Sequence, residues 1–232
     1  MTRFLPVIVA GNPFESFSED PTPLLSALRT VSESRFLEPV VVVHSSWLND
    51  AVSMAGRLAA SVTFIAMPDG TPSAALAAAG FLTAEFIDGK APVALLDARV
   101  RRGSPNCFTR EVTAGLQDVQ SGGIVSFMKG DQPSGEFAFM PAAAVAEYED
   151  RAPGILSYAS ASLRSSVSEG NVIRTPDVPF IGRGEDDMSE ILLQSADLRE
   201  VRRVDLSQVK LFSPWGGGHS NYDGFYAPRF PA

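Results

Sequence analysis

The chain has 232 residues, of which 45% are hydrophobic and 20% charged. This composition excludes disordered and collagen-like proteins, and the length allows one sizeable core, so we expect a single domain over residues 1–232. The formal net charge of −8 opposes binding to a phosphate backbone. The one basic cluster, Arg99, Arg101 and Arg102, is too small to reverse that sign, so nucleic acid is not an expected partner.

The apolar runs are all much shorter than the roughly 20 residues that cross a bilayer, so no membrane partner is expected. Phe4–Ala10 is shorter, and less basic at its start, than a secretory signal. The single cysteine, Cys107, cannot form an internal disulfide, which is typical of reducing compartments. We therefore expect a cytoplasmic protein. A homodimer or a protein partner stays open.

Short β-branched segments alternate with Ala- and Leu-rich segments in the first half of the chain, which predicts alternating strands and helices. The predicted strands are Phe4–Ala10, Val40–His44, Val62–Met67, Val93–Leu96 and Ile124–Met128. The predicted helices are Pro23–Ser32, Leu48–Ala60, Pro72–Glu85 and Phe108–Gln120. The strands are nearly continuous apolar runs, as expected where helices cover both faces of a mainly parallel sheet. A Rossmann-like α/β core is predicted.

Two Thr-Pro pairs mark predicted helix starts. At Thr22-Pro23 and Thr71-Pro72 the hydroxyl is expected to cap a helix whose first residue is the proline.

Beyond Pro133 the pattern breaks into short segments rich in Ala, Ser, Gly and Pro. There we predict a helix at Asp187–Ala196, strands at Glu200–Val204 and Val209–Phe212, and a long exposed loop at Asn171–Glu185.

Ligands of open α/β sheets bind beyond the carboxyl ends of the strands, so the residues after each predicted strand are candidates. Ala10 is followed by Gly11 and Asn12, where a phosphate-binding turn or an ordinary tight turn fits. Asp69, Gly70 and Thr71 follow the third predicted strand. A base or a phosphate can dock on this loop, and the same residues equally suit a simple turn.

The fourth predicted strand is followed by a lone carboxylate, Asp97. Proteins hold Mg²⁺ with one or two carboxylates plus phosphate oxygens and waters, so a single aspartate is compatible with Mg²⁺. Alternatively, Asp97 caps a turn or pairs with Arg99 or Arg101. Neither of the two histidines belongs to a Cys/His cluster with zinc spacing, and no Gly-x-Ser-x-Gly elbow is present. The glycines of 216–218 form either an anion-binding nest or a structural loop.

Taken in chain order, these segments resemble the sugar-phosphate nucleotidyltransferases, and most closely the mannose-1-phosphate guanylyltransferases, across roughly residues 4 to 226. Pro6–Gly11 is similar to the opening of the family's Gly-Gly-x-Gly-x-Arg loop. Met67–Ala78 resembles a shortened copy of its Pro-x-Gly-Arg-Asn-Thr-Ala-Pro segment, and Leu96-Asp97 resembles its Pro-Ala-Asp. Gly123–Phe127 is similar to its Gly-x-Val-Thr-Phe strand.

The second half carries weaker matches in the same order. Ser134–Met140, which includes Gly135, resembles the Thr-Gly-Tyr-Gly-Tyr-Ile segment with one residue inserted. Tyr148–Pro153 lies where a Phe-Val-Glu-Lys-Pro motif is expected, with Asp150 and Arg151 replacing its Glu and Lys. The segment from Trp215 is similar to the family's Trp-x-Asp-x-Gly-x-Trp.

The resemblance implies a Rossmann-like three-layer nucleotidyltransferase fold of the GT-A type, with a mainly parallel mixed sheet. It also implies a reaction that joins a sugar 1-phosphate to a nucleoside triphosphate and releases pyrophosphate, with Mg²⁺ offsetting charge. The nucleotide or nucleotide sugar is expected to contact Ala10, Gly11, Asn12, Gly70, Thr71, Gly135, Asp150 and Arg151. Asp97 is the expected metal ligand.

The chain departs from the family at its charged positions, and no catalytic residue is assigned. The first loop lacks two glycines and the arginine, no lysine follows at Pro21–Pro23, and the Arg-Asn pair is deleted. The second metal aspartate appears as Gly217 and a sugar-binding asparagine as Ala159. Phosphoryl chemistry depends on positioned cations. We therefore expect either a weak or altered enzyme, or an inactive relative that binds a nucleotide or a partner; Asp97-Ala98-Arg99 is not the Asp-x-Asp of a glycosyltransferase.

Overall fold

The computed structural model describes eleven stretches of the chain, and all structural statements below concern them. They are residues 3–10, 22–31, 36–58, 60–88, 91–98, 101–102, 124–129, 132–141, 154–180, 201–203 and 211–212. No helix within these stretches is both long and apolar enough to cross a membrane.

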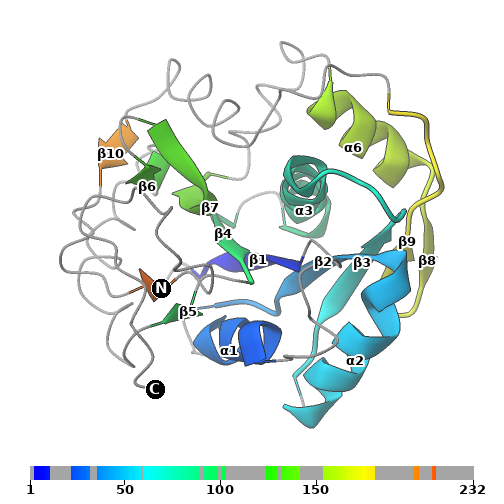
Figure 1. Cartoon of the computed structure of the whole chain (residues 1–232), viewed down its shortest axis with the longest axis horizontal. Helices are drawn as coiled ribbons and strands as arrows, with labels where there is room; N and C mark the ends of the chain where they lie inside the picture. Colours follow the sequence, from blue (N-terminus) through cyan, green and yellow to red (C-terminus); the bar gives the residue numbers. More distant parts are fainter. Residues whose placement is uncertain are drawn as a thin grey trace, which may run out of the picture.

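Nine of the described strands form one mixed sheet (Figure 1). From one edge to the other they are β10 (Val201–Arg203), β6 (Ile124–Lys129), β7 (Gln132–Met140), β4 (Val93–Asp97), β1 (Leu5–Ala10), β2 (Val40–His44), β3 (Thr63–Met67), β9 (Val172–Arg174) and β8 (Val167–Glu169). The run from β4 to β9 is parallel, whereas β7 is antiparallel to both β4 and β6, and β8 to β9. The predicted α/β fold with a mainly parallel mixed sheet is therefore confirmed. A separate short pair joins β5 (Arg101–Arg102) to β11 (Leu211–Phe212).

Helices cover both faces of the parallel strands, as Figure 1 shows. On one face lie α1 (Thr22–Val31) and α2 (Leu48–Arg57), which pack with Ile8 and Ala10 of β1. On the other lie α3 (Ser73–Asp88) and α6 (Ile155–Arg164), which pack with Val7 and Val9. Successive residues of a strand point to opposite faces, so each face receives half of the apolar run. The continuous apolar sequence of β1 is thereby accounted for.

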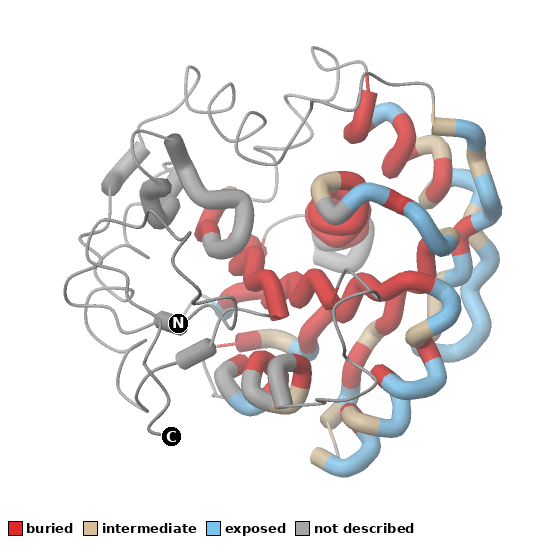
Figure 2. The backbone as a smooth tube through the Cα atoms, in the orientation of Figure 1, coloured by how far each residue is buried: buried red, intermediate tan, exposed pale blue. Residues whose placement is uncertain are grey.

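The centre of the sheet is closed to solvent. Every residue of β1, β2 and β4 is buried, and Figure 2 shows these strands as the buried middle of the molecule. Helix α3 lies especially close to the sheet at Gly80. A Cβ built there overlaps the Cγ1 atom of Val7 and lies 3.1 Å from Cγ2 of Val42. Glycine at this position lets the helix backbone approach the strands.

The predicted strands and helices of the first half are present with small shifts at their ends, apart from Phe108–Gln120, which lies outside the described residues. Both predicted Thr-Pro helix starts need a correction. Helix α1 begins at Thr22 itself, one residue before the predicted first residue Pro23, and α3 begins after its proline. The carbonyl of Pro72 accepts from the backbone nitrogens of Ala75 at 2.9 Å and Leu76 at 3.1 Å, so proline precedes the first helical residue, Ser73. The Thr71 hydroxyl donates to the carbonyl of Pro68 at 2.6 Å instead of capping the helix.

The second half contains elements that the sequence did not predict, namely β7, α6 and β8. The prediction of one long loop at Asn171–Glu185 is wrong for residues 172–174, which form β9 and pair with β3. Asn171 donates from Nδ2 to the carbonyl of Val62 at 2.8 Å, which secures the start of this pairing. The predicted helix at Asp187–Ala196 lies outside the described residues.

Candidate functional site

The carboxyl ends of the four central parallel strands meet at one edge of the sheet, and this edge is the candidate site. The last residues of β1, β2, β3 and β4 are Ala10, His44, Met67 and Asp97. Asp97 pairs with Val9, and the backbone nitrogen of Ala98 donates to the carbonyl of Val9 at 2.9 Å. Asp97 is thus fixed beside the end of β1, where the residue is only 7% exposed.

Gly135 comes to the same edge from the other direction. In the antiparallel pairing of β7 with β4, Phe137 lies opposite Leu96, and Gly135 precedes Phe137 by two residues. Because β7 begins where β4 ends, the backbone of Gly135 lies at the edge that carries Asp97. The strand order thus places Ala10, Asp97 and Gly135, three predicted site residues, on neighbouring strands.

The loop between β3 and α3 forms a tight turn at the same edge. The backbone nitrogen of Thr71 donates to the carbonyl of Pro68 at 3.2 Å, and Gly70 has φ +86°. A positive φ at the third residue is what a type II turn requires, and glycine adopts it without strain. The turn leaves Asp69 and Gly70 exposed and buries Thr71.

Ser45 and Ser46 tie this turn to the start of α2. They lie in η1 (Ser45–Trp47), a short 3-10 helix between β2 and α2. The Ser45 hydroxyl donates to the carbonyl of Met67 at 3.0 Å. Ser46 donates to Oδ1 of Asp69 from its backbone nitrogen at 3.1 Å and from its hydroxyl at 2.8 Å. The backbone hydrogen bond, then the hydroxyl, holds the pKa of Asp69 below its ordinary value, so the turn carries a carboxylate.

Two further residues, His44 and Tyr158, contact the buried side of the turn. Nε2 of His44 lies 2.9 Å from the carbonyl oxygen of Thr71, and the hydroxyl of Tyr158 lies 3.3 Å from Oγ1 of Thr71. Sequence reasoning did not assign either residue to the site. His44 ends a predicted strand, so the rule that drew attention to Asp97 also applies to it. Nothing local in the sequence points to Tyr158, which is 87 residues away from Thr71.

The predicted site residues form two groups among the described residues, and the remaining four lie outside the described residues. Ala10, Asp97 and Gly135 lie together on β1, β4 and β7, and Gly70 and Thr71 follow β3. The strand order puts three strand spacings between β4 and β3, about 14 Å, which side chains do not bridge but a ligand lying along the edge does. The predicted residues Gly11, Asn12, Asp150 and Arg151 lie outside the described residues. The binding roles of all these residues remain predictions.

The donor set for a metal is small. Among the described residues, no three or more His, Cys, Asp or Glu side chains gather closely enough to hold an ion by themselves. A single carboxylate at a strand end fits Mg²⁺, which proteins commonly bind through one or two carboxylates together with substrate phosphates. Asp97 therefore suits a metal that arrives with a phosphorylated ligand.

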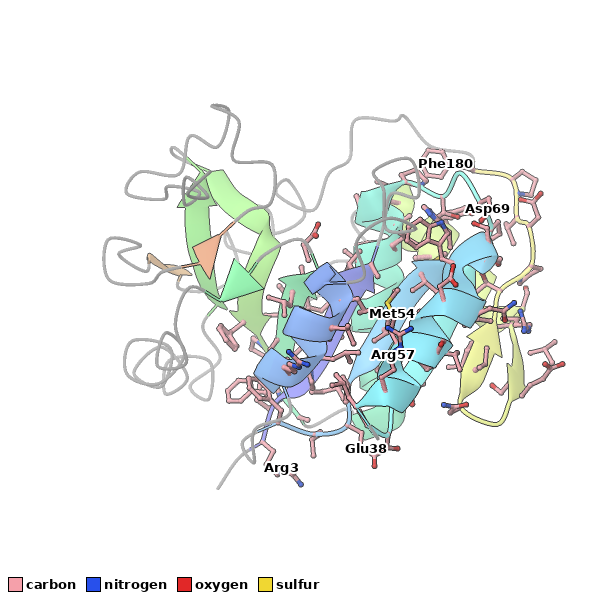
Figure 3. All side chains as sticks on the ribbon, turned by 60° about the horizontal axis from the view of Figure 1, so that its bottom comes forward. Arg3, Glu38, Met54, Arg57, Asp69 and Phe180 are labelled. Carbon is pink, nitrogen blue, oxygen red and sulfur yellow. The ribbon has the colours of Figure 1, made fainter. Side chains whose placement is uncertain are left out.

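Figure 3 gives the orientation of the edge. Asp69 and Phe180 lie toward one end of the parallel strands, and Glu38 and Arg3 lie toward the other end. Glu38 is exposed and lies two residues before the start of β2, at the amino edge of the sheet. It therefore provides an acidic reference position away from the candidate site.

No protein-family model matches the sequence, and no curated protein matches it either. Solved structures do match. A mannose-6-phosphate isomerase from Helicobacter pylori is 14% identical over 88% of this chain and 92% of its own, with a TM-score of 0.59. A protein assigned as a glucose-1-phosphate thymidylyltransferase from Bacillus anthracis is 10% identical over 87% of each chain, with a TM-score of 0.55. A mannose-1-phosphate geranyltransferase from Thermus thermophilus is 14% identical over 88% of this chain and 74% of its own, with a TM-score of 0.55.

The chain has a nucleotidyltransferase-type α/β fold. At 10 to 14% identity the likeness concerns the fold alone. The three names denote three different reactions, and one fold can carry several chemistries, so the fold does not select the reaction. The activity has to be argued from the edge of the sheet.

Proposed function

We propose that this chain binds a nucleoside triphosphate or a nucleotide sugar at the carboxyl edge of its sheet, as a sugar-phosphate nucleotidyltransferase or a catalytically inactive relative. The observation that carries this proposal is the position of Asp97. It ends β4, is paired in register with Val9, and lies beside Ala10, in a fold shared with a glucose-1-phosphate thymidylyltransferase. Ligands of open α/β sheets bind at this edge.

The charges at the edge favour one orientation of a bound nucleotide. Asp69 presents an exposed carboxylate on the turn after β3, and its pKa is lowered, so it is ionised at neutral pH. A triphosphate placed against this carboxylate is repelled, because both groups are negative. The uncharged base or ribose is therefore the better neighbour of Asp69 and Gly70. The phosphates then extend toward Asp97, where Mg²⁺, when bound, offsets their charge.

The substrate pair that the sequence resemblance suggests is GTP and mannose 1-phosphate. The expected activity is low, because Asp97 is the one charged position of the family's catalytic set that the sequence retains. The alternative function is nucleotide binding without turnover, in a regulatory or interaction protein. That alternative is favoured by the loss of the loop arginine and the following lysine, since phosphoryl transfer depends on positioned cations.

A thermal-shift screen tests the proposal. The unfolding midpoint is measured with nucleoside triphosphates and nucleotide sugars, each with and without Mg²⁺, because a ligand of the folded state raises its stability. We expect at least one nucleotide to raise the midpoint, and Asp97→Asn to remove the Mg²⁺-dependent part of the rise. Glu38→Gln, at the opposite edge, is the matched control and should behave as wild type. Absence of a shift with every nucleotide would contradict the proposal.

A further inference from the structure

Thr71 is held from three sides. Its backbone nitrogen and its hydroxyl both bond to Pro68, His44 contacts its carbonyl oxygen from the end of β2, and Tyr158 contacts its hydroxyl from α6. We call His44, Thr71 and Tyr158 the Thr71 clamp. All three residues are buried, at 4%, 5% and 7% exposure, so a ligand at the edge meets the neighbouring exposed Gly70 instead.

The direction of each hydrogen bond follows from the chemistry of the groups. A carbonyl oxygen only accepts, so Nε2 of His44 carries the proton in its contact with Thr71. The single hydroxyl proton of Thr71 goes to the Pro68 carbonyl at 2.6 Å, so the Tyr158 hydroxyl is the donor in the 3.3 Å contact. Both proton donors of Thr71 thus bond to Pro68, and His44 and Tyr158 donate to its carbonyl and hydroxyl oxygens.

The two ring nitrogens of His44 have different surroundings. Nδ1 is buried and has no hydrogen-bond partner. A buried polar atom without a partner is unfavourable, and an apolar side chain of similar size avoids that penalty. The polar ring of His44 therefore acts on the turn through its one bonded atom, Nε2. The hydrogen bond that the structure describes for that atom holds the carbonyl of Thr71.

Tyr158 is itself fixed from outside. Its ring packs edge-on against Phe180, with centroids 5.3 Å apart and an interplanar angle of 85°. Phe180 follows Thr175 by five residues, and the backbone nitrogen and hydroxyl of Thr175 both donate to the carbonyl of Ala66 in β3. Pro176 and Pro179 restrict the backbone between Thr175 and Phe180. Tyr158 thus contacts Phe180 through its ring and Thr71 through its hydroxyl.

We propose that His44 and Tyr158 are positioning residues for ligand binding, which act through Thr71 to fix the exposed Asp69–Gly70 turn in its binding conformation. This inference rests on the proposed function, because it assumes that a nucleotide lies against the turn. Neither residue contacts the ligand. A turn fixed before binding loses less conformational freedom when the ligand arrives, so loosening the clamp weakens affinity.

The test compares affinities of folded variants. Dissociation constants for GTP and for GDP-mannose, each with Mg²⁺, are measured by calorimetry well below the unfolding midpoint of every variant. His44→Leu removes the Nε2 donor, and His44→Gln restores an amide nitrogen at the same place along the side chain. Tyr158→Phe removes the hydroxyl that reaches Thr71. Ser162→Ala is the matched control, because Ser162 is a buried hydroxyl on the same helix that has no hydrogen-bond partner.

We expect His44→Leu and Tyr158→Phe each to weaken binding about 3- to 10-fold, the value of one modest hydrogen bond. His44→Gln and Ser162→Ala should stay within about 2-fold of wild type. If His44→Leu does not fold, the comparison of Tyr158→Phe with Ser162→Ala still decides the matter. Equal affinities for Tyr158→Phe and Ser162→Ala would overturn the positioning role while leaving the proposed function intact. A wild-type protein that binds neither ligand, nor any nucleotide in the wider screen, would overturn both.

Discussion

Ser46 gives both of its hydrogen bonds to a single oxygen of Asp69, from the backbone nitrogen at 3.1 Å and from the hydroxyl at 2.8 Å. Ser46 lies in η1, directly before α2, and neither element has a side-chain cap from its own N-terminal residue. A carboxylate near a helix N-terminus is favourable because unpaired N–H groups point toward it. Asp69 therefore caps η1, the short turn that leads into α2, from the neighbouring loop.

This relationship predicts a pH-dependent contribution to stability. The pKa of Asp69 is lower in the folded protein, so its stabilising effect is complete above the unfolded pKa of about 4 and is lost as the pH falls through the folded value. We expect Asp69→Asn to lower the free energy of unfolding by less than about 1 kcal/mol near pH 6, because the carboxylate is exposed and solvent screens it. The difference should shrink below about pH 4. Urea unfolding of both proteins across this range checks it, and a difference that grows on acidification would contradict the capping role.

A second prediction separates the backbone strain at Gly70 from the role of its turn in nucleotide binding. Gly70 and Gly170 both have positive φ, +86° and +62°, and a Cβ at either meets nothing within 4 Å. Alanine at each position should cost about 1–2 kcal/mol, since only the backbone conformation is unfavourable. Gly170 lies in the turn between β8 and β9, so Gly170→Ala should leave nucleotide affinity unchanged while Gly70→Ala reduces it. Chemical unfolding and calorimetry measure the two effects. An equal loss of affinity in both variants would argue against a ligand at the β3–α3 turn.

A third prediction concerns the close approach of α3 to the sheet. Gly80→Ala places a methyl group against buried Val7 and Val42, and overpacking of this kind costs about 1–3 kcal/mol. The control is Gly56→Ala in α2, where a Cβ meets nothing within 4 Å. That change should stabilise the protein by about 1 kcal/mol through helix propensity. Opposite signs in thermal unfolding are expected, and a stabilising Gly80→Ala would mean that α3 shifts freely on the sheet.

The fourth prediction is that purified protein releases little or no pyrophosphate from GTP and mannose 1-phosphate. Loss of one preorganised electrostatic group commonly costs about 10²- to 10³-fold in rate, and the loop arginine, a lysine and one metal aspartate are absent at the positions that resemble the family. Pyrophosphate release is measured across several nucleotides and sugar phosphates, with Asp97→Ala as the variant for any activity found. Fast turnover that disappears in this variant would contradict an inactive protein.

Sequence patterns predicted the parallel half of the sheet because each strand is a buried apolar run whose signal is local. Strand β7 was missed because it contains Pro133 and Gly135, which are uncommon in the interior of strands. Helix α6 was missed because its sequence, ILSYASASLR, is rich in serine, which favours helix ends and turns in isolation. Its packing against α3 and the sheet compensates for this weak local preference.

The candidate site was predictable where a residue ends a strand or follows it within three residues, as Asp97 and Gly70 do. Topology alone places such residues at one edge. Tyr158 could not be found this way, because its role depends on a contact with Thr71 that spans 87 residues. Asp69 lies in a loop that the same rule selects, but its hydrogen bonds from Ser46, which belongs to a different strand connection, could not be predicted from the sequence.

The outer boundary of the sheet at β8 has a consequence for solubility. Strand β8 has three residues, all exposed, and its Glu169 forms an ion pair with Arg174 of β9 at 3.6 Å. A short, charged border strand offers few main-chain groups to a strand from another molecule, and its charges must lose water on pairing. The exposed side chain of Val167 therefore does not make this border an effective template for aggregation.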